Sequence, residues 1–345
     1  MGRARVLRAL AALVLVGACA SVPGNAWTEV SLPGAGPRLL RAAVACGEHW
    51  YVVGGRSGSG GETSPAAWES TDGRTWRGLP LTPLPGSYYG PRSVLYAVAC
   101  AHGTIAAIGS VGGGAHGNPR TSTWHQRPDG SLAEAAAPFE TYGGDTAVDV
   151  GRIAGGPSGF LLAGNRTSGA AAWLSTDGVA FRLFENAPGL AGAFARDGAV
   201  LDGQFVLVGG LGNTAAAWLS TDGESWRRVG MPVEGGYAEA QRVVRLGADL
   251  IAVGPRGDTY GAWRGPEWAA SGRFGRPGAT GIRSLTVSDG RLYAAADDLW
   301  RSDDGGRSWL TVTTPRAASP LTAIAGRDGG LLLLAGDRAW LAHGV

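Results

Sequence analysis

The sequence predicts an all-β fold, a β-propeller in which seven four-stranded sheets surround a central axis, with six sheets as the alternative. One apolar, glycine-punctuated unit recurs at a spacing of about 40 to 55 residues, which is typical of propeller blades. The 59 glycines, 19 prolines and 13 tryptophans, with only 17% charged residues, favour short strands joined by tight turns. A segment near the N-terminus also resembles the one strand that the last unit lacks.

Each unit contains an apolar strand that ends in glycine, as in residues 51–54 and 206–209. A glycine-rich loop, a third strand, a turn and a fourth strand follow, which is the order expected of a blade. Six units are evident, and a shorter remnant supplies about three further strands. They start near Arg38, Arg92, Thr146, Ala193, Ala238 and Gly281, with the remnant from Leu321 to Val345.

The fourth strand missing from the remnant is expected at the other end of the chain. Residues 27–33 begin with Trp27 and resemble the fourth strands that begin at Trp76, Trp226 and Trp309. If this N-terminal strand completes the last blade, the ring closes at seven blades and neither terminal sheet keeps an unpaired edge.

A Ser-x-Asp turn closed by an aromatic residue follows the third strand in four units. The carboxylate can accept turn N–H groups, glycine supplies a positive φ, and the aromatic ring is buried between strands. The members are Ser70, Asp72 and Trp76; Ser175, Asp177 and Phe181; Ser220, Asp222 and Trp226; and Ser302, Asp304, Gly306 and Trp309.

This pattern resembles the Asp-box, or bacterial neuraminidase repeat, of the sialidase-like β-propeller family. The resemblance covers most of the chain through its spacing. It implies that the turns join the third and fourth strands of blades on the face away from the ligand site. The four aspartates are therefore expected to stabilise turns.

The N-terminus has the pattern of an export signal. Arg3, Arg5 and Arg8 precede an apolar run over residues 9–18, which is too short to span a bilayer. Residues 15–19, Leu-Val-Gly-Ala-Cys, resemble the bacterial lipobox. We therefore expect a lipoprotein signal peptide over 1–18, a lipid on Cys19, a linker over 19–25 and one propeller domain over 26–345. An ordinary secretory signal is the alternative.

Charge and composition limit the partners. Without residues 1–18 the chain loses three arginines, and its formal charge falls from +2 to about −1, which disfavours nucleic acid. We expect an extracytoplasmic monomer on the outer face of the cell membrane, held only by its lipid, with a protein or glycan partner at the cell envelope. No cofactor or metal is expected, because the scattered histidines and cysteines lack ligand spacing.

The two remaining cysteines, Cys46 and Cys100, occupy matching positions in the first strands of consecutive units. Outside the cytoplasm they can form a disulfide between neighbouring blades. Equally, each can be a small buried thiol in a repeated core position.

The loops that link blades gather on one face of a propeller, and arginines near the unit starts can form a cationic ring there. Such a ring would suit carboxylate, sulfate or phosphate groups, although the arginines can also be solvated or paired with nearby acids. The arginines are Arg38, Arg92, Arg196, Arg242 and Arg283. Two long glycine-rich loops, Gly54 to Pro65 and Gly109 to Thr121, are expected on the same face, and the nearby candidates are Tyr88, Tyr89, His116, Arg120 and Tyr142.

No residue is assigned a catalytic role. Tyr237 with Glu239, or Glu140 with Tyr142, could form the tyrosine and carboxylate pair of a sialidase, but the Arg-Ile-Pro motif of that family is absent. The sequence therefore favours a non-catalytic binding or scaffold protein. A sialidase-like glycoside hydrolase with a divergent active site is the alternative, and ligand capture for a transporter is a third hypothesis.

Overall fold

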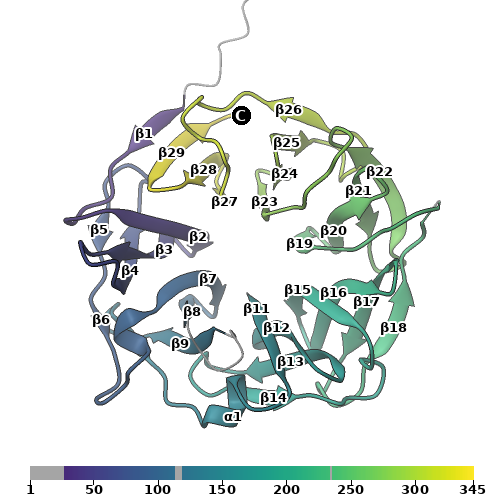
Figure 1. Ribbon diagram of the computed structural model, residues 1–345. Coiled ribbons are helices and arrows are strands. Elements are labelled where there is room, and N and C mark those ends of the chain that lie inside the picture. Colours follow the sequence, from purple (N-terminus) through teal and green to yellow (C-terminus); the bar gives the residue numbers. More distant parts are fainter. Residues whose placement is uncertain (1–26, 113–118, 234) are drawn as a thin grey trace, which may run out of the picture.

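A computed structural model describes residues 27–112, 119–233 and 235–345 of the chain. These residues form seven sheets arranged as a ring around a central channel (Figure 1). The prediction of an all-β propeller is confirmed, with seven blades rather than six. The expected signal peptide, the lipid-bearing Cys19, the linker and His116 lie outside the described residues.

Each blade runs from an innermost strand at the channel to an outermost strand at the rim, and neighbouring strands are antiparallel except where a fifth strand, β6, pairs parallel with β10 in blade 2. Two helical turns, η1 (Gly90–Arg92) and α1 (Phe139–Tyr142), lie in the links before and after blade 2. The strands of blades 1 to 3 are β2 (Arg38–Cys46), β3 (His49–Ser57), β4 (Thr63–Ser70) and β5 (Arg77–Gly78); β7 (Val94–Ala101), β8 (Thr104–Val111), β9 (Arg120–Gln126), β10 (Leu132–Glu134) and β6 (Leu81–Thr82); and β11 (Ala147–Gly156), β12 (Gly159–Arg166), β13 (Gly169–Ser175) and β14 (Arg182–Phe184). Those of blades 4 to 7 are β15 (Phe194–Leu201), β16 (Gln204–Leu211), β17 (Thr214–Ser220) and β18 (Arg227–Gly230); β19 (Arg242–Leu246), β20 (Asp249–Arg256), β21 (Thr259–Arg264) and β22 (Ala269–Phe274); β23 (Ser284–Ser288), β24 (Arg291–Ala295), β25 (Leu299–Ser302) and β26 (Leu310–Val312); and β27 (Ala323–Arg327), β28 (Gly330–Ala335), β29 (Arg338–His343) and β1 (Thr28–Val30).

The core is divided among the interfaces between blades. The third strand of each blade carries one tryptophan. Five of these side chains are fully buried, Trp340 is nearly so, and Trp300 is half-buried. Each ring packs among alanines and branched residues of its own blade and a neighbouring blade. A fully buried large apolar side chain contributes roughly 1.5–3 kcal/mol. The fully buried members are Trp68, Trp124, Trp173, Trp218 and Trp263.

The N-terminal strand completes the last blade, as predicted. In β1, Thr28, Glu29 and Val30 pair antiparallel with β29. A surface ion pair between Glu29 and Arg338 lies on the same seam. Blade 7 therefore joins both ends of the described chain, and the outer edge of β29 is covered.

A disulfide between Cys46 and Cys100 connects the innermost strands of blades 1 and 2, with Cα atoms 5.4 Å apart. Of the two alternatives for these cysteines, the structure contains the bonded one. Cys46 is buried and Cys100 is half-buried beside the channel.

A β-bulge recurs in the innermost strands of blades 1 to 4, near the start of each strand. Each bulge inserts one residue that has no partner in the ladder, and such insertions redirect side chains. Four of the inserted residues, Arg41, Tyr96, Gly151 and Arg196, line the same end of the channel, and a second bulge in β11 inserts Val148.

Candidate functional site

The two ends of the channel carry different features. In blade 1, Arg38 pairs with Arg56 at one end of the sheet, whereas Cys46 pairs with His49 and Trp50 pairs with Ser70 at the other. The Ser-x-Asp turns therefore lie at the end opposite the bulges. This is the separation that the family resemblance implies.

The Ser-x-Asp turns share one set of hydrogen bonds. In blade 1 the Asp72 carboxylate accepts the N–H groups of Arg74 and Thr75 at 2.8 and 2.7 Å, and the Ser70 hydroxyl donates to it at 2.9 Å. Gly73 has a φ of 71°, and its carbonyl accepts Nε1 of Trp76. The turns at Asp177, Asp222 and Asp304 repeat the carboxylate contacts.

These contacts favour the charged form of each aspartate. Hydrogen bonds from turn N–H groups lower the pKa of Asp72, Asp177 and Asp222. At Asp304, the hydroxyl and N–H of Ser308 lower the pKa to about 2. All four side chains bond within their own turns, so these aspartates act on local structure.

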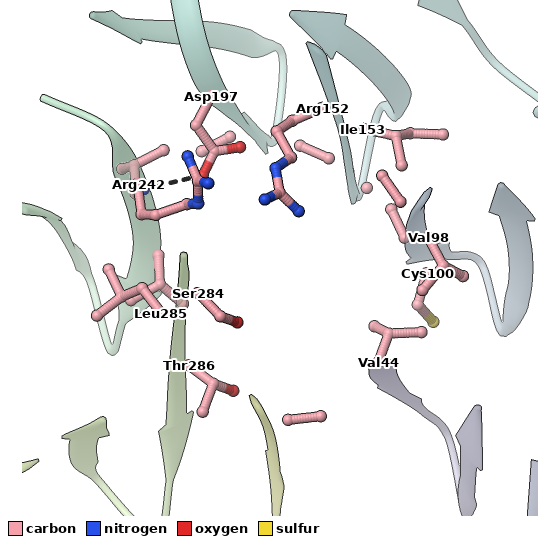
Figure 2. A pocket seen from close by; sticks show the side chains of 18 of the residues that line it. Val44, Val98, Cys100, Arg152, Ile153, Asp197, Arg242, Ser284, Leu285 and Thr286 are labelled. Atoms are coloured by element: carbon pink, nitrogen blue, oxygen red, sulfur yellow. Dashed lines mark hydrogen bonds between the residues drawn. The ribbon is translucent and has the colours of Figure 1, made fainter. Parts of the chain in front are cut away.

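The channel itself is a cavity of about 450 Å³ lined by the innermost strands of all seven blades. In Figure 2, Val44, Val98 and Cys100 lie on one side of the channel and Arg242 with Asp197 lies on the other, while Arg152 lies between them beside Ile153. The charged side continues into a second cavity of about 740 Å³ at the bulge end.

We call this second cavity the channel mouth. Five arginines from five different blades line it, together with Tyr96, Gln241 and two threonines. Such a concentration of guanidinium groups creates a positive local potential. The arginines are Arg41, Arg152, Arg196, Arg242 and Arg283.

Three of the arginines are held by backbone carbonyls rather than by acids. The carbonyl of Arg283 accepts Nη2 of Arg152 at 3.2 Å and Nε of Arg242 at 2.9 Å. The Arg283 guanidinium in turn donates to the carbonyls of Ala296 and Leu321. Burial and the neighbouring Arg152 charge lower the pKa of Arg242, so two like charges are held close together.

The acids near the channel mouth form links between blades. Asp197 accepts the N–H of Gly198 and that of Val243 in blade 5, and burial raises its pKa. Glu239 accepts Nε of Arg196 at 2.8 Å and Nε2 of Gln241 at 2.8 Å.

Asp149 accepts the amide of Asn165, which also donates to the carbonyl of Ala195 in blade 4. Burial raises the pKa of Asp149. The three carboxylates near these arginines are thus already engaged with neighbouring groups, and none of them lines the channel mouth.

The arginines proposed from sequence separate into two groups. Arg196, Arg242 and Arg283 line the channel mouth. Arg38 instead donates to the carbonyl of Leu32, and Arg92 stacks on Tyr88, 4.2 Å from its ring centroid.

Sequence reasoning missed two arginines of the channel mouth. Arg41 is the inserted residue of a bulge, and Arg152 directly follows one. No spacing rule would place them at the mouth, because a bulge adds one residue to the alternation of inward and outward side chains.

The residues proposed for a hydrolase also lie in different places. Tyr237 is near Glu239, whose charge contributes to a raised pKa of the phenol, although burial is the larger cause. Glu140 and Tyr142 lie in α1, and burial raises the pKa of Tyr142 to about 12.

The remaining aromatic candidates lie in a separate hollow. Tyr88, Tyr89, Arg120 and Tyr142 line a cavity of about 820 Å³ between the links that enter and leave blade 2. None of them lines the channel mouth. The single ligand face expected from sequence is therefore two hollows.

Membrane-spanning helices and metal-binding clusters are both missing from the described parts of the chain. Across these ranges no helix has the length and hydropathy needed to cross a bilayer. Nor do residues 27–112, 119–233 and 235–345 bring together three histidine, cysteine or acidic side chains as a metal would require.

The chain shares its fold with β-propellers of varied function. Virginiamycin B lyase from Staphylococcus aureus superposes with a TM-score of 0.66 at 12% identity, covering 92% of this chain and 99% of that one. A structure described as YCF48 bound to D1 peptide gives 0.62 at 14% identity, covering 93% and 96%. Trypanosoma rangeli sialidase gives 0.50 at 14% identity, covering 84% and 59%. No family model and no curated protein matches the sequence.

Proposed function

We propose that this protein is an exported, lipid-anchored propeller of the Asp-box type that binds an anionic group of a cell-envelope partner at its channel mouth, without catalysis. The partner is a protein or glycan, and the anionic group is a carboxylate, sulfate or phosphate. The lipid on Cys19 would hold the propeller at the outer face of the membrane as a monomer.

The convergence of Arg152 and Arg242 carries this proposal. Two guanidinium groups are fixed by one carbonyl, and Asp197, a carboxylate whose pKa burial raises and both arginine charges lower, is engaged by two backbone N–H groups. Guanidinium groups bind oxyanions through paired, charge-assisted hydrogen bonds. An anion in the channel mouth would therefore relieve repulsion that the unliganded protein has to bear.

The state of the acids supports a non-catalytic role. Glycosidases of this type need one acid or base free to move a proton and one group free to attack. Glu239 has a side chain that is 6% exposed and is held by Arg196 and Gln241. Asp197 and Asp149 tie neighbouring blades together.

One observation favours the sialidase-like hydrolase as a second candidate. Tyr237 and Glu239 are adjacent, and Glu239 is the kind of base that could activate a tyrosine nucleophile. This alternative predicts turnover of sialosides or other glycosides that Glu239→Gln abolishes. Absence of turnover with intact anion binding would support the binding role.

The test of the binding role is calorimetric titration of the purified protein with inorganic phosphate, with sulfate, and with acetate. We expect binding that weakens about tenfold or more in Arg152→Gln and Arg242→Gln. Arg182→Gln is the matched control, because its guanidinium is exposed and pairs with Glu224 on the outer rim. Equal affinity in all four proteins, or no binding to any of them, would refute the proposal.

The proposed anchor has its own test. Cys19→Ser should move the protein from the membrane fraction to a soluble, exported form, because no other lipid attachment is expected. Retention in the membrane fraction would refute lipidation at Cys19.

A further inference from the structure

The hollow beside blade 2 has the composition of a binding site. We call it the aromatic cleft; its walls are residues 84–89 on one side and residues 137–145 on the other, and the start of β9 forms its floor. Tyr88 and Phe139 are 64% and 57% exposed, unusual for such large rings. Its volume of about 820 Å³ suits a ligand segment, since ligand pockets are typically about 300–1,000 Å³.

Buried charged groups hold the walls of the cleft in place. On the first wall, the Glu134 carboxylate accepts the N–H of Leu84 at 2.9 Å and the hydroxyl of Ser87 at 2.8 Å. On the second wall, Arg166 donates to the carbonyls of Glu140 and Thr141. Since both charged residues are buried and fix these loops, the cleft is formed before any ligand arrives.

Arg120 lies between the walls. Its guanidinium is 5.8 Å from the ring centroid of Tyr89 and 4.7 Å from that of Phe139, so each wall stacks against it. Nε of Arg120 is buried and has no hydrogen-bond partner among the described residues. Tyrosine and arginine together are the residues that most often dominate binding energy at protein interfaces.

The floor of the cleft is an edge of a β-sheet with which no strand in residues 27–112, 119–233 and 235–345 pairs. On its outer side β9 pairs with β10 only from Trp124 to Gln126, and one further bond joins Ala135 N–H to the Thr123 carbonyl. In an antiparallel ladder the backbone groups of every second residue face the same side, so those of Thr121 face the cleft. No strand among the described residues pairs with β9 there.

We infer that the aromatic cleft binds an extended peptide segment of a partner protein. The segment adds a short strand beside Thr121, places an apolar or proline side chain against Tyr88 and Phe139, and sets an acidic side chain against Arg120. An open strand edge favours a peptide over a glycan, because only a peptide carries the alternating N–H and C=O groups that extend a ladder. This site is separate from the channel mouth and does not depend on it.

The test starts from an immobilised library of random linear peptides with both ends blocked, so that no terminal carboxylate can bind at the channel mouth. Affinity of a selected peptide is then measured by fluorescence anisotropy. Tyr88→Ala combined with Phe139→Ala should weaken it by about tenfold or more, and Arg120→Gln should weaken it several-fold. Both rings are exposed, so their removal leaves the core intact, which circular dichroism would verify.

Two kinds of control distinguish the aromatic cleft from the channel mouth and from non-specific adsorption. Arg242→Gln, which alters the channel mouth, and Arg182→Gln, on the outer rim, should leave the affinity for the peptide unchanged. N-methylation of the peptide residue that faces Thr121 should abolish binding, and hydrogen exchange at the Thr121 amide should slow in the complex.

Three results would overturn the inference: no blocked peptide binds, binding is indifferent to the Tyr88 and Phe139 substitutions, or a glycan array yields the ligand that these substitutions release. These experiments measure binding at the aromatic cleft alone, so a negative result would not contradict the anion-binding proposal. Conversely, if phosphate, sulfate and acetate do not bind at the channel mouth, the inference of peptide binding at the aromatic cleft is unaffected.

Discussion

The Ser-x-Asp turns and the channel mouth occupy opposite ends of the same blades, and they differ in how strictly they repeat. In all four turns a serine hydroxyl donates to the aspartate two residues later, and that carboxylate also accepts two backbone N–H groups from the residues that follow. At the channel mouth, the corresponding positions of blades 1 to 4 hold Arg41, Tyr96, Gly151 and Arg196. The end that repeats stabilises four of the seven blades, whereas the end that varies offers the chemistry of a binding site.

The largest expected loss of stability comes from the closing aromatic residue of a turn. Trp226 is buried and donates to the Gly223 carbonyl, so Trp226→Ala should lower the free energy of unfolding by about 3–5 kcal/mol. Blade 3 has Phe181 at this position, so Trp226→Phe should cost much less. Thermal unfolding measures both. An equal loss for the two variants would show that the turns are not equivalent.

Removal of the disulfide should cause the second-largest loss of stability. It closes a loop with a sequence separation of 54, and loops of this size predict a loss of about 2–4 kcal/mol in Cys46→Ala combined with Cys100→Ala. The wild type measured with a reductant should show the same shift in denaturation midpoint. Unchanged stability in both cases would argue against a bond between blades 1 and 2.

Loss of a single turn carboxylate should cost less again. Asp304→Ala removes the acceptor for the N–H groups of Arg307 and Ser308, a loss comparable to that of a helix N-cap, or about 1 kcal/mol. Binding of anions and peptides should not change. A fall in affinity with unchanged stability would reverse the roles assigned to the two ends.

The same carboxylates predict how stability depends on pH. Their folded pKa lies below the usual value of 3.8, and that of Asp304 is about 2. A lowered folded pKa means that the stabilisation is complete above about pH 4 and is lost as the pH falls towards 2. Denaturation midpoints measured between pH 6 and pH 2 should therefore fall in this range, and less steeply in Asp304→Ala.

The smallest effect on stability is expected at the channel mouth. Arg41 is exposed on a bulge, so Arg41→Gln should change the free energy of unfolding by no more than about 0.5 kcal/mol. Its affinity for phosphate, sulfate or acetate should nevertheless fall several-fold. A stability loss as large as that of Asp304→Ala would mean that the channel mouth is a structural feature as well.

The repeated features were accessible from sequence because they depend on local chemistry. Glycine, the Ser-x-Asp spacing and the tryptophans mark each blade, and Trp27 with its neighbours revealed the closing strand. The fifth strand of blade 2 was not expected: Leu81 and Thr82 pair parallel with β10, an arrangement that no local pattern signals. It depends on the path of a link between blades.

The residues of the channel mouth and the aromatic cleft could be predicted from the sequence only in part. Arg196, Arg242 and Arg283 were proposed from their positions near unit starts, whereas Arg41 and Arg152 were not proposed. Arg41, Arg152 and Arg196 all lie at bulges, where the alternation of the strand shifts and no longer indicates which side chains face the mouth. The aromatic cleft brings Tyr89 and Phe139 together from two links that flank a whole blade. Sequence suggested Tyr89 but not Phe139, and only the three-dimensional arrangement shows that the two rings flank one hollow.

The bulges create positions at which the side chain can be exchanged without disturbing the sheet. Because each inserted residue has no partner in the ladder, its side chain can be exchanged without altering the pairing of the strand that carries it. A few point substitutions at these positions could therefore change the charge of the opening, from cationic to neutral or anionic, while the surrounding scaffold keeps its shape.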